Sequence, residues 1–257
     1  MHSIDSVRLR NVIKLLVAKK SEIDNYFYAY VFVPYRVDIE NCFVDHNLES
    51  AKRLLDFSFT TRQVGQNSSA IRNYETKKEE VMEILKGTLH LLKSDDYNPK
   101  KRYEMSLALI NSIEGIGQKI ASMFLKFIVY YSKDFPGKRE IARELFIPFD
   151  SHVLKLLFTK INDKSTNRLN LYDESVNQSA LQYDIKSVEP LVLKSNRLLY
   201  LQRNIREDFD ELKVEEPPII LDYLWYVGSM YCSTRFGDIG CAVCFLRQEC
   251  GFHRSGM

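Results

Sequence analysis

The positions of hydrophobic residues along the chain predict a protein built almost entirely of helices. Apolar side chains recur every three or four residues over most of its length, which is the spacing of amphipathic helices. We expect helices over residues 7–33, 47–59, 75–93, 103–113, 118–131, 140–145, 149–160, 189–212 and 219–231. No two segments read convincingly as paired strands, and the polar stretch 164–177 is expected to be a surface connection. The pattern therefore predicts an all-α fold.

Size and composition are those of an ordinary globular protein. The 257 residues suffice for one large domain or two modest ones, with 45% apolar and 27% charged residues. The net charge of +2 gives little overall attraction for nucleic acid. Basic residues nevertheless gather in the central third, at Lys100, Lys101, Arg102, Lys119, Lys126, Lys133, Lys138, Arg139 and Arg143. Such a cluster suits either a nucleic-acid surface or an ordinary solvated helix surface.

No segment has the features of a membrane helix or of a secretion leader. The apolar runs fall short of the roughly 20 residues that a membrane helix needs. A basic segment followed by an apolar one is also lacking at the start of the chain. We therefore expect a cytoplasmic protein without a membrane partner, in a compartment where thiols stay reduced.

Four cysteines gather near the end of the chain. Cys232, Cys241, Cys244 and Cys250 have the spacing C-x8-C-x2-C-x5-C. In a reducing compartment this spacing favours a metal site over a disulfide framework. An iron–sulfur cluster and zinc both accept four thiolates, so both remain candidates. The fifth cysteine, Cys42, lies outside the pattern and is expected to be a buried apolar thiol.

A short glycine turn joins two of the predicted helices, within the sequence I-E-G-I-G-Q-K of residues 113–119. Gly115 and Gly117 flank Ile116 and allow a tight turn with close backbone approach. Free amides at the start of the next helix would face outward, where the helix dipole favours an anion such as a DNA phosphate. We expect this turn, with Gln118, to bind the DNA backbone, although the glycines would also suit a plain helix–turn–helix connection.

These features together resemble the helix–hairpin–helix DNA glycosylase superfamily. The glycine hairpin and its lysine match residues 113–119, and the family's P-x-D at a helix start matches residues 148–150. Residues 224–232, with the three further cysteines, are similar to the cluster loop of endonuclease III. The clear motifs cover approximately residues 100–157 and 219–252.

The resemblance implies a two-lobed helical fold. A central helical domain with the hairpin would span residues 48–149. Residues 1–47 and 150–257 would form a second domain, which carries the cysteine loop 232–250. In endonuclease III-like proteins such a loop holds a 4Fe–4S cluster, and zinc is the competing occupant here.

The resemblance also implies a bifunctional DNA glycosylase and AP lyase of base excision repair. Lys119 would attack the sugar C1′ of the damaged nucleotide and form a Schiff base, which permits β-elimination. Asp150 would cap its helix and stabilise positive charge that develops on the sugar. The partner would be double-stranded DNA with a damaged base, bound near the nucleoid by a monomer. The alternative from another class is a non-catalytic hairpin module that only binds DNA.

Two features of the resemblance indicate different substrates. The separation between Lys119 and Asp150 is longer than in most members of the superfamily, and it is similar to that of archaeal 8-oxoguanine DNA glycosylases. The cysteine loop is instead similar to that of enzymes that remove oxidised pyrimidines. We expect an oxidised base as the substrate, with 8-oxoguanine favoured.

Chemistry on a base requires that the base leave the duplex and enter a pocket. Met123 lies one turn after Lys119 and would line this pocket. Asp222 and Trp225, one turn apart in the last predicted helix, would bind and stack on the base, although they would also suit the core. Three polar residues in the turn after residue 59 would fill the gap left in the duplex, namely Gln63, Gln66 and Asn67.

Overall fold

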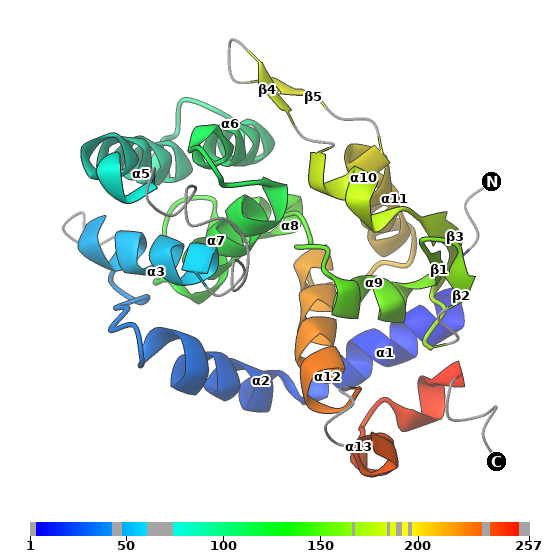
Figure 1. Ribbon diagram of the computed structural model, residues 1–257. Coiled ribbons are helices and arrows are strands. Elements are labelled where there is room, and N and C mark those ends of the chain that lie inside the picture. The colour runs from blue at the N-terminus through cyan, green and yellow to red at the C-terminus, as the bar shows by residue number, and fades with distance from the viewer. Residues whose placement is uncertain are drawn as a thin grey trace. The chain divides into compact units, whose positions relative to one another are not determined.

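The computed structural model describes residues 4–42, 48–60, 74–165, 168–183, 186–188, 192–194, 197–232 and 237–251. The protein is mostly helical, as predicted (Figure 1). It divides into two compact units, which are described separately. Unit 1 comprises Met1–Asp24, Phe149–Leu181 and Leu199–Met257, and unit 2 comprises Asn25–Pro148 and Gln182–Leu198. Residues 25–47, which we expected in the domain formed by both termini, therefore group with the central segment.

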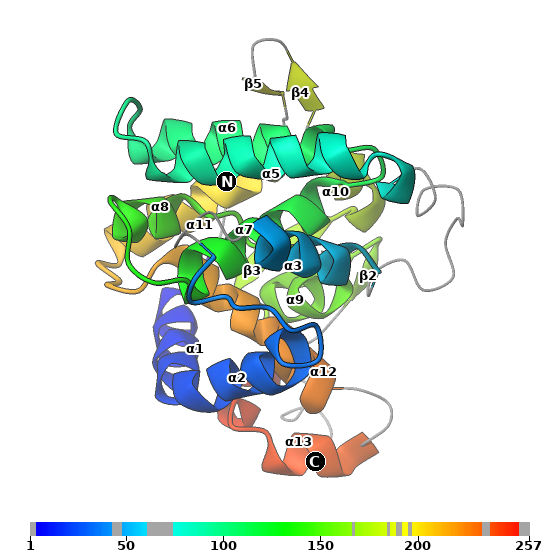
Figure 2. The ribbon, with the colours of Figure 1, turned by 90° about the vertical axis from the view of Figure 1, so that its left-hand side faces the viewer.

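Unit 2 is organised around the helix α7, Gln118–Tyr131. Its other elements are α2 (Lys20–Phe27, shared with unit 1), η1 (Tyr28–Phe32), α3 (Leu48–Thr60), α5 (Lys78–Lys93), α6 (Pro99–Ser112), α8 (Lys138–Glu144), β4 (Lys186–Val188) and β5 (Val192–Lys194). Helix α7 is buried along almost all of its length, and α3, α6 and α8 pack against it. Figure 2 shows α5 and α6 side by side, in agreement with their extensive contact. A helix that is apolar on most sides forms the core of its unit.

Two of the basic residues in the central third lie inside unit 2 rather than on its surface. Arg102 and Lys126 are each only 3% exposed. The Lys126 Nζ lies 4.6 Å from the ring centre of Phe27 and 4.2 Å from that of Phe127. These aromatic faces attract the cation. The basic cluster read from the sequence therefore contributes fewer charges to the surface than its residue count indicates.

The long helix expected over residues 7–33 is three elements instead of one. Helix α1 (Ser6–Ala18) belongs to unit 1, Lys19 is its C-cap, and α2 follows. The π-helix η1 continues from α2, and its Phe32 packs against Phe127 of α7 with ring centres 5.5 Å apart. The apolar periodicity is similar in all three elements, so it could not reveal these breaks.

Unit 1 combines helices with a small sheet that the sequence pattern did not predict. Its remaining elements are α9 (Ser151–Leu157), β1 (Phe158–Ile161), β2 (Lys164–Ser165), β3 (Tyr172–Val176), α10 (Gln178–Tyr183, shared with unit 2), α11 (Arg197–Glu211, likewise shared), η2 (Pro218–Tyr223), α12 (Leu224–Met230), α13 (Gly237–Val243) and η3 (Arg247–Glu249). The strand order is β2-β1-β3, with β1 antiparallel to β2 and parallel to β3. The helix predicted over 149–160 therefore ends early, and the predicted connection 164–177 contains two strands.

Local turn chemistry explains the first of these strand pairs. Asn162 and Asp163 both have positive φ, at 49° and 62°, and they join β1 to β2. Asparagine and aspartate tolerate this conformation, which tight hairpins require.

In unit 2, β4 and β5 form a second antiparallel pair. The helix that we predicted over residues 189–212 therefore begins later, at Arg197. Within the part of the chain that the structure describes, no helix is both long and apolar enough to cross a membrane.

The loop between α7 and α8 is fixed to α5 and α6 by Arg102. Its Nη1 donates hydrogen bonds to the carbonyl oxygens of Leu92, Ser94 and Pro136, at 3.2, 2.9 and 3.1 Å. Gly137 lies against the same guanidinium with φ of 73°, and a Cβ there would be 2.0 Å from Nη2. This position therefore requires glycine for its backbone conformation and for space.

We expect Gly137→Ala to lower the free energy of unfolding by about 1–3 kcal/mol, because alanine is strained at positive φ. Gly87→Ala is the matched control, since a Cβ at Gly87 within α5 would lie an ordinary 3.8 Å from Leu109 Cδ1. That control should raise stability by up to about 1 kcal/mol. Urea unfolding of both variants measures the difference, and equal stabilities for the two would contradict the assignment.

Candidate functional site

The glycine hairpin lies in unit 2, between α6 and α7. Gly115 has φ of 84°, a conformation that residues with a side chain avoid. The Ile116 amide donates to the Ile113 carbonyl at 3.0 Å and closes the turn. Gly117 is the N-cap of α7, and no side-chain hydrogen bond caps the helix from this position. The local structure is therefore the uncapped helix start that anion binding uses.

Two of the four residues predicted to bind DNA have buried side chains. Gly115 and Gly117 are exposed, whereas Ile116 is 4% and Gln118 is 3% exposed. The Gln118 Nε2 donates to the Ser122 hydroxyl at 2.9 Å inside the unit. Ile116 and Gln118 therefore anchor the hairpin to the core, and only backbone groups can offer a phosphate contact at these two positions. Burial of Gln118 was not visible in the sequence, because a glutamine beside Lys119 at a helix start is ordinarily solvated.

Lys119 occupies the first turn of α7. Its side chain is partly buried, so it lies between the core and the solvent at the positive end of the helix dipole. Met123 follows one turn later and is buried within unit 2. Its predicted role in lining a base pocket stays a prediction.

Asp150 is the N-cap of α9 in unit 1. Its Oδ1 accepts hydrogen bonds from the amides of His152 and Val153, both at 2.9 Å, and the residue is 2% exposed. The predicted capping role is confirmed. Two charge-assisted hydrogen bonds hold the carboxylate in one orientation.

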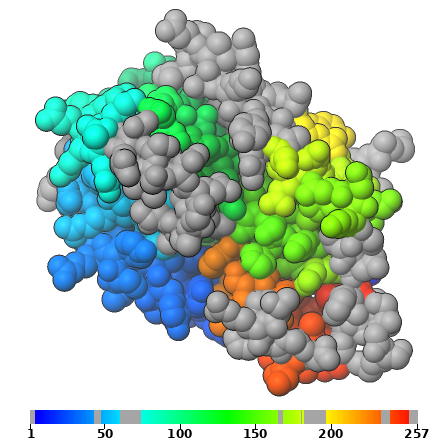
Figure 3. Space-filling model, in the orientation of Figure 1, coloured from blue at the N-terminus to red at the C-terminus, as the bar shows by residue number. Residues whose placement is uncertain are grey.

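Helix α9 packs closely against α12 in unit 1, and both reach the surface side by side (Figure 3). Gly228 permits this approach, because a Cβ there would lie 2.5 Å from the Cβ of His152. Asp222 is buried in η2, whereas Trp225 is half-buried on α12. The sequence placed both residues on one α-helix, but Pro217 and Pro218 start a 3-10 helix that contains Asp222 and ends before Trp225.

The four loop cysteines influence one another electrostatically in unit 1. Burial raises the pKa of Cys232, and the thiolates of Cys250 and Cys241 raise it further, while Arg168 lowers it by charge and by a hydrogen bond. Burial raises the pKa of Cys244 to about 12, against a backbone hydrogen bond from Leu246. The Gly251 amide also donates to the Arg168 carbonyl at 2.7 Å, which ties the loop to residue 168.

Four free thiols are the donor set that an iron–sulfur cluster or zinc takes. All four loop cysteines are half-buried, but the structure does not gather them into such a site. Among the described residues, no group of three or more His, Cys, Asp or Glu side chains is arranged as a metal site. Cys42, in contrast, is buried and donates to the Asp38 carbonyl at 3.3 Å, as expected for a structural thiol.

Neither the remaining predicted residues nor comparison with known proteins adds evidence about what the site does. The proposed duplex-filling residues Gln63, Gln66 and Asn67 lie outside the described residues. No protein-family model matches the chain, and no curated protein or solved structure shows a significant match to it. The function of the site therefore has to be inferred from the residues of the chain itself.

Proposed function

We propose that the chain is a bifunctional DNA glycosylase and AP lyase that removes an oxidised base from double-stranded DNA. The observation that carries this proposal is the hairpin: Gly115 with positive φ precedes an uncapped helix start, and Lys119 lies in the first turn of that helix. Such a helix start binds a phosphate without reading the base sequence. It would bring the Lys119 amine close to the sugar attached to that phosphate.

The reaction then follows from the chemistry of an amine. Attack of Lys119 Nζ on the sugar C1′ forms a C–N bond as the glycosidic bond breaks, and the base leaves with a proton. Opening of the sugar ring gives a Schiff base between Lys119 and C1′. Loss of a proton from C2′ then expels the 3′ phosphate and cleaves the strand.

Asp150 supplies the second catalytic group in this proposal. Its carboxylate would stabilise the positive charge that develops at C1′ as the base departs. The two amides that bind Oδ1 hold the group in place before the substrate arrives, so no reorganisation is needed during the reaction. Lys119 belongs to unit 2 and Asp150 to unit 1, as in the two-domain helix–hairpin–helix fold that we propose for the chain.

Among substrates, 8-oxoguanine is favoured by the long sequence separation between Lys119 and Asp150. The cysteine loop supports the second candidate, an oxidised pyrimidine. We also propose that the loop holds a 4Fe–4S cluster, which would fix the C-terminal segment in place through four thiolates. Asp222, the half-buried Trp225 and Met123 remain the proposed contacts for the flipped base.

Lys119→Gln tests the nucleophile, with incision of labelled duplexes that carry 8-oxoguanine, thymine glycol or uracil. We expect strand cleavage to fall on the order of 1,000-fold or more, because glutamine cannot form a Schiff base. Borohydride should trap a covalent complex with the wild-type protein and none with this variant. Lys100→Gln, which alters an exposed lysine of the same unit, should leave trapping unchanged. A trapped complex in the Lys119 variant would refute the assignment.

Asp150→Asn separates catalysis from helix capping. Asparagine keeps an oxygen that accepts from both amides, so stability should change little, whereas base release should fall roughly a hundredfold or more. Asp150→Ala should in addition lower the free energy of unfolding by about 1 kcal/mol. Thermal unfolding and single-turnover base release measure the two effects. Full activity of the asparagine variant would leave Asp150 as a cap only.

The identity of the bound metal can be tested on the purified protein. A 4Fe–4S cluster gives a brown protein with iron and acid-labile sulfide, whereas zinc gives a colourless protein with one metal ion per chain. We expect Cys244→Ser to lose colour and iron. Cys42→Ser is the control, because Cys42 lies outside the loop, and it should keep both. A colourless wild-type protein that contains zinc would overturn the cluster proposal.

A further inference from the structure

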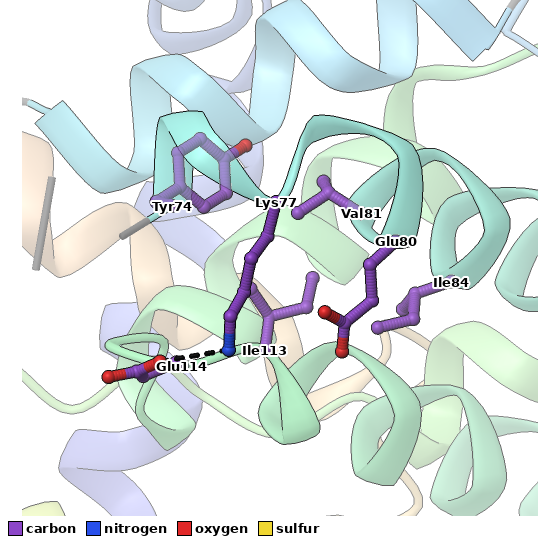
Figure 4. Close-up of a pocket in the computed structure, with 7 residues that line it drawn as sticks. All are labelled: Tyr74, Lys77, Glu80, Val81, Ile84, Ile113 and Glu114. Carbon is purple, nitrogen blue, oxygen red and sulfur yellow. Dashed lines mark hydrogen bonds and ion pairs between the residues drawn. The ribbon is translucent and has the colours of Figure 1, made fainter. Parts of the chain in front are cut away.

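An ion pair connects the hairpin turn to the start of another helix. Glu114 directly precedes Gly115, and its Oε2 lies 3.0 Å from the Nζ of Lys77, the N-cap residue of α5 (Figure 4). The two residues are 37 positions apart in sequence. Their side chains are 46% and 53% exposed, so both are in contact with solvent.

The pair lies across a shallow pocket with an apolar floor. The pocket is lined by Tyr74, Lys77, Glu80, Val81, Ile84, Ile113 and Glu114. In Figure 4 the Lys77 side chain extends over this floor to Glu114, and the Glu80 carboxylate lies on the other side. The hydrogen bond and charge of Glu114, followed by the charge of Glu80, raise the pKa of Lys77. Lys77 is therefore held as a cation between two carboxylates.

A carboxylate at residue 114 opposes the function proposed for the hairpin. It is adjacent in sequence to the glycine that would approach a DNA phosphate, and like charges repel within a Debye length of about 10 Å at 0.1 M salt. Residues 113–119 contain one acid, Glu114, and one base, Lys119, so the hairpin has no excess positive charge of its own. A cation beside Glu114 removes this repulsion.

We propose that Lys77 is a positioning residue for DNA binding, which neutralises Glu114 and holds its carboxylate against the pocket, away from the phosphate bound by the hairpin. The proposal rests on the function proposed above, because it requires that the hairpin bind DNA. An exposed ion pair contributes little to folding, at most about 1 kcal/mol. The effect of the pair should therefore appear in DNA affinity rather than in stability.

The full chain with Lys77→Met, with Glu114→Gln and with both changes tests this proposal on a short labelled duplex. At about 0.05 M salt, fluorescence anisotropy should show affinity lowered roughly two- to fivefold for Lys77→Met, which exposes the Glu114 charge. Glu114→Gln should raise affinity by a similar factor, because Lys77 then adds an uncompensated positive charge. The double variant should return to within about twofold of the wild type.

Lys86→Met is the matched control on the same helix. Lys86 also pairs with a glutamate, Glu83, at 4.0 Å, and is 62% exposed. It lies about 14 Å further along α5 than Lys77, so its charge is more distant from the hairpin. Its removal should change affinity much less than removal of Lys77. The Lys77 effect should also shrink as the salt concentration rises, because screening weakens exposed charges.

Three outcomes would overturn the proposal. An equal loss of affinity in Lys86→Met and in Lys77→Met would mean that the total charge, and not the ion pair with Glu114, sets DNA affinity. Weaker binding in both single variants without recovery in the double variant would assign the loss of affinity to distortion of the turn. Unchanged affinity in every variant would show that the pair has no role in binding. Absence of DNA binding by the wild-type protein would instead refute the proposed function itself.

Discussion

The burial of α7 is the constraint on which the arrangement of unit 2 depends. A helix with so little polar surface must be covered, and α3, α6 and α8 cover it. Because the body of the helix is fixed, its start at Gly117 and the preceding turn are fixed as well. Ile116 and Gln118 reinforce this by inserting side chains into the core on either side of Gly117. The hairpin is therefore a rigid part of the core that exposes its glycines.

The free backbone amides at the starts of α7 and α9, which carry the proposed chemistry, are satisfied in different ways. At α9 the Asp150 carboxylate satisfies two amides and is held rigid by them. At α7 the N-cap is Gly117, which has no side chain, so its first amides need water or a ligand as hydrogen-bond acceptor. The first arrangement suits a fixed catalytic carboxylate, and the second suits binding of a phosphate. If the hairpin binds a phosphate as proposed, the pair formed by Lys77 and Glu114 would adjust the charge beside it.

The sequence was sufficient to predict those parts of the site that depend only on residues close together along the chain. The turn at Gly115 and the cap at Asp150 are set by backbone conformation and by hydrogen bonds across two or three residues, and both appear as expected. The strands were missed because β1 and β3 pair across an intervening segment, and no local periodicity encodes that pairing. The adjacent Asn162 and Asp163 were a local signal for the β1–β2 turn, because both residue types tolerate the positive φ that they adopt there.

The sequence by itself determined the mostly helical character, the glycine hairpin, the helix cap and the set of four loop cysteines, because each depends on residue type and short-range spacing. Only the tertiary structure decided which basic residues are buried, since burial depends on packing between elements distant in sequence. It also brought Lys77 to Glu114, which no spacing rule connects. Ion pairs of this kind form wherever the folded backbone places two side chains within reach, and that placement is a property of the packed core.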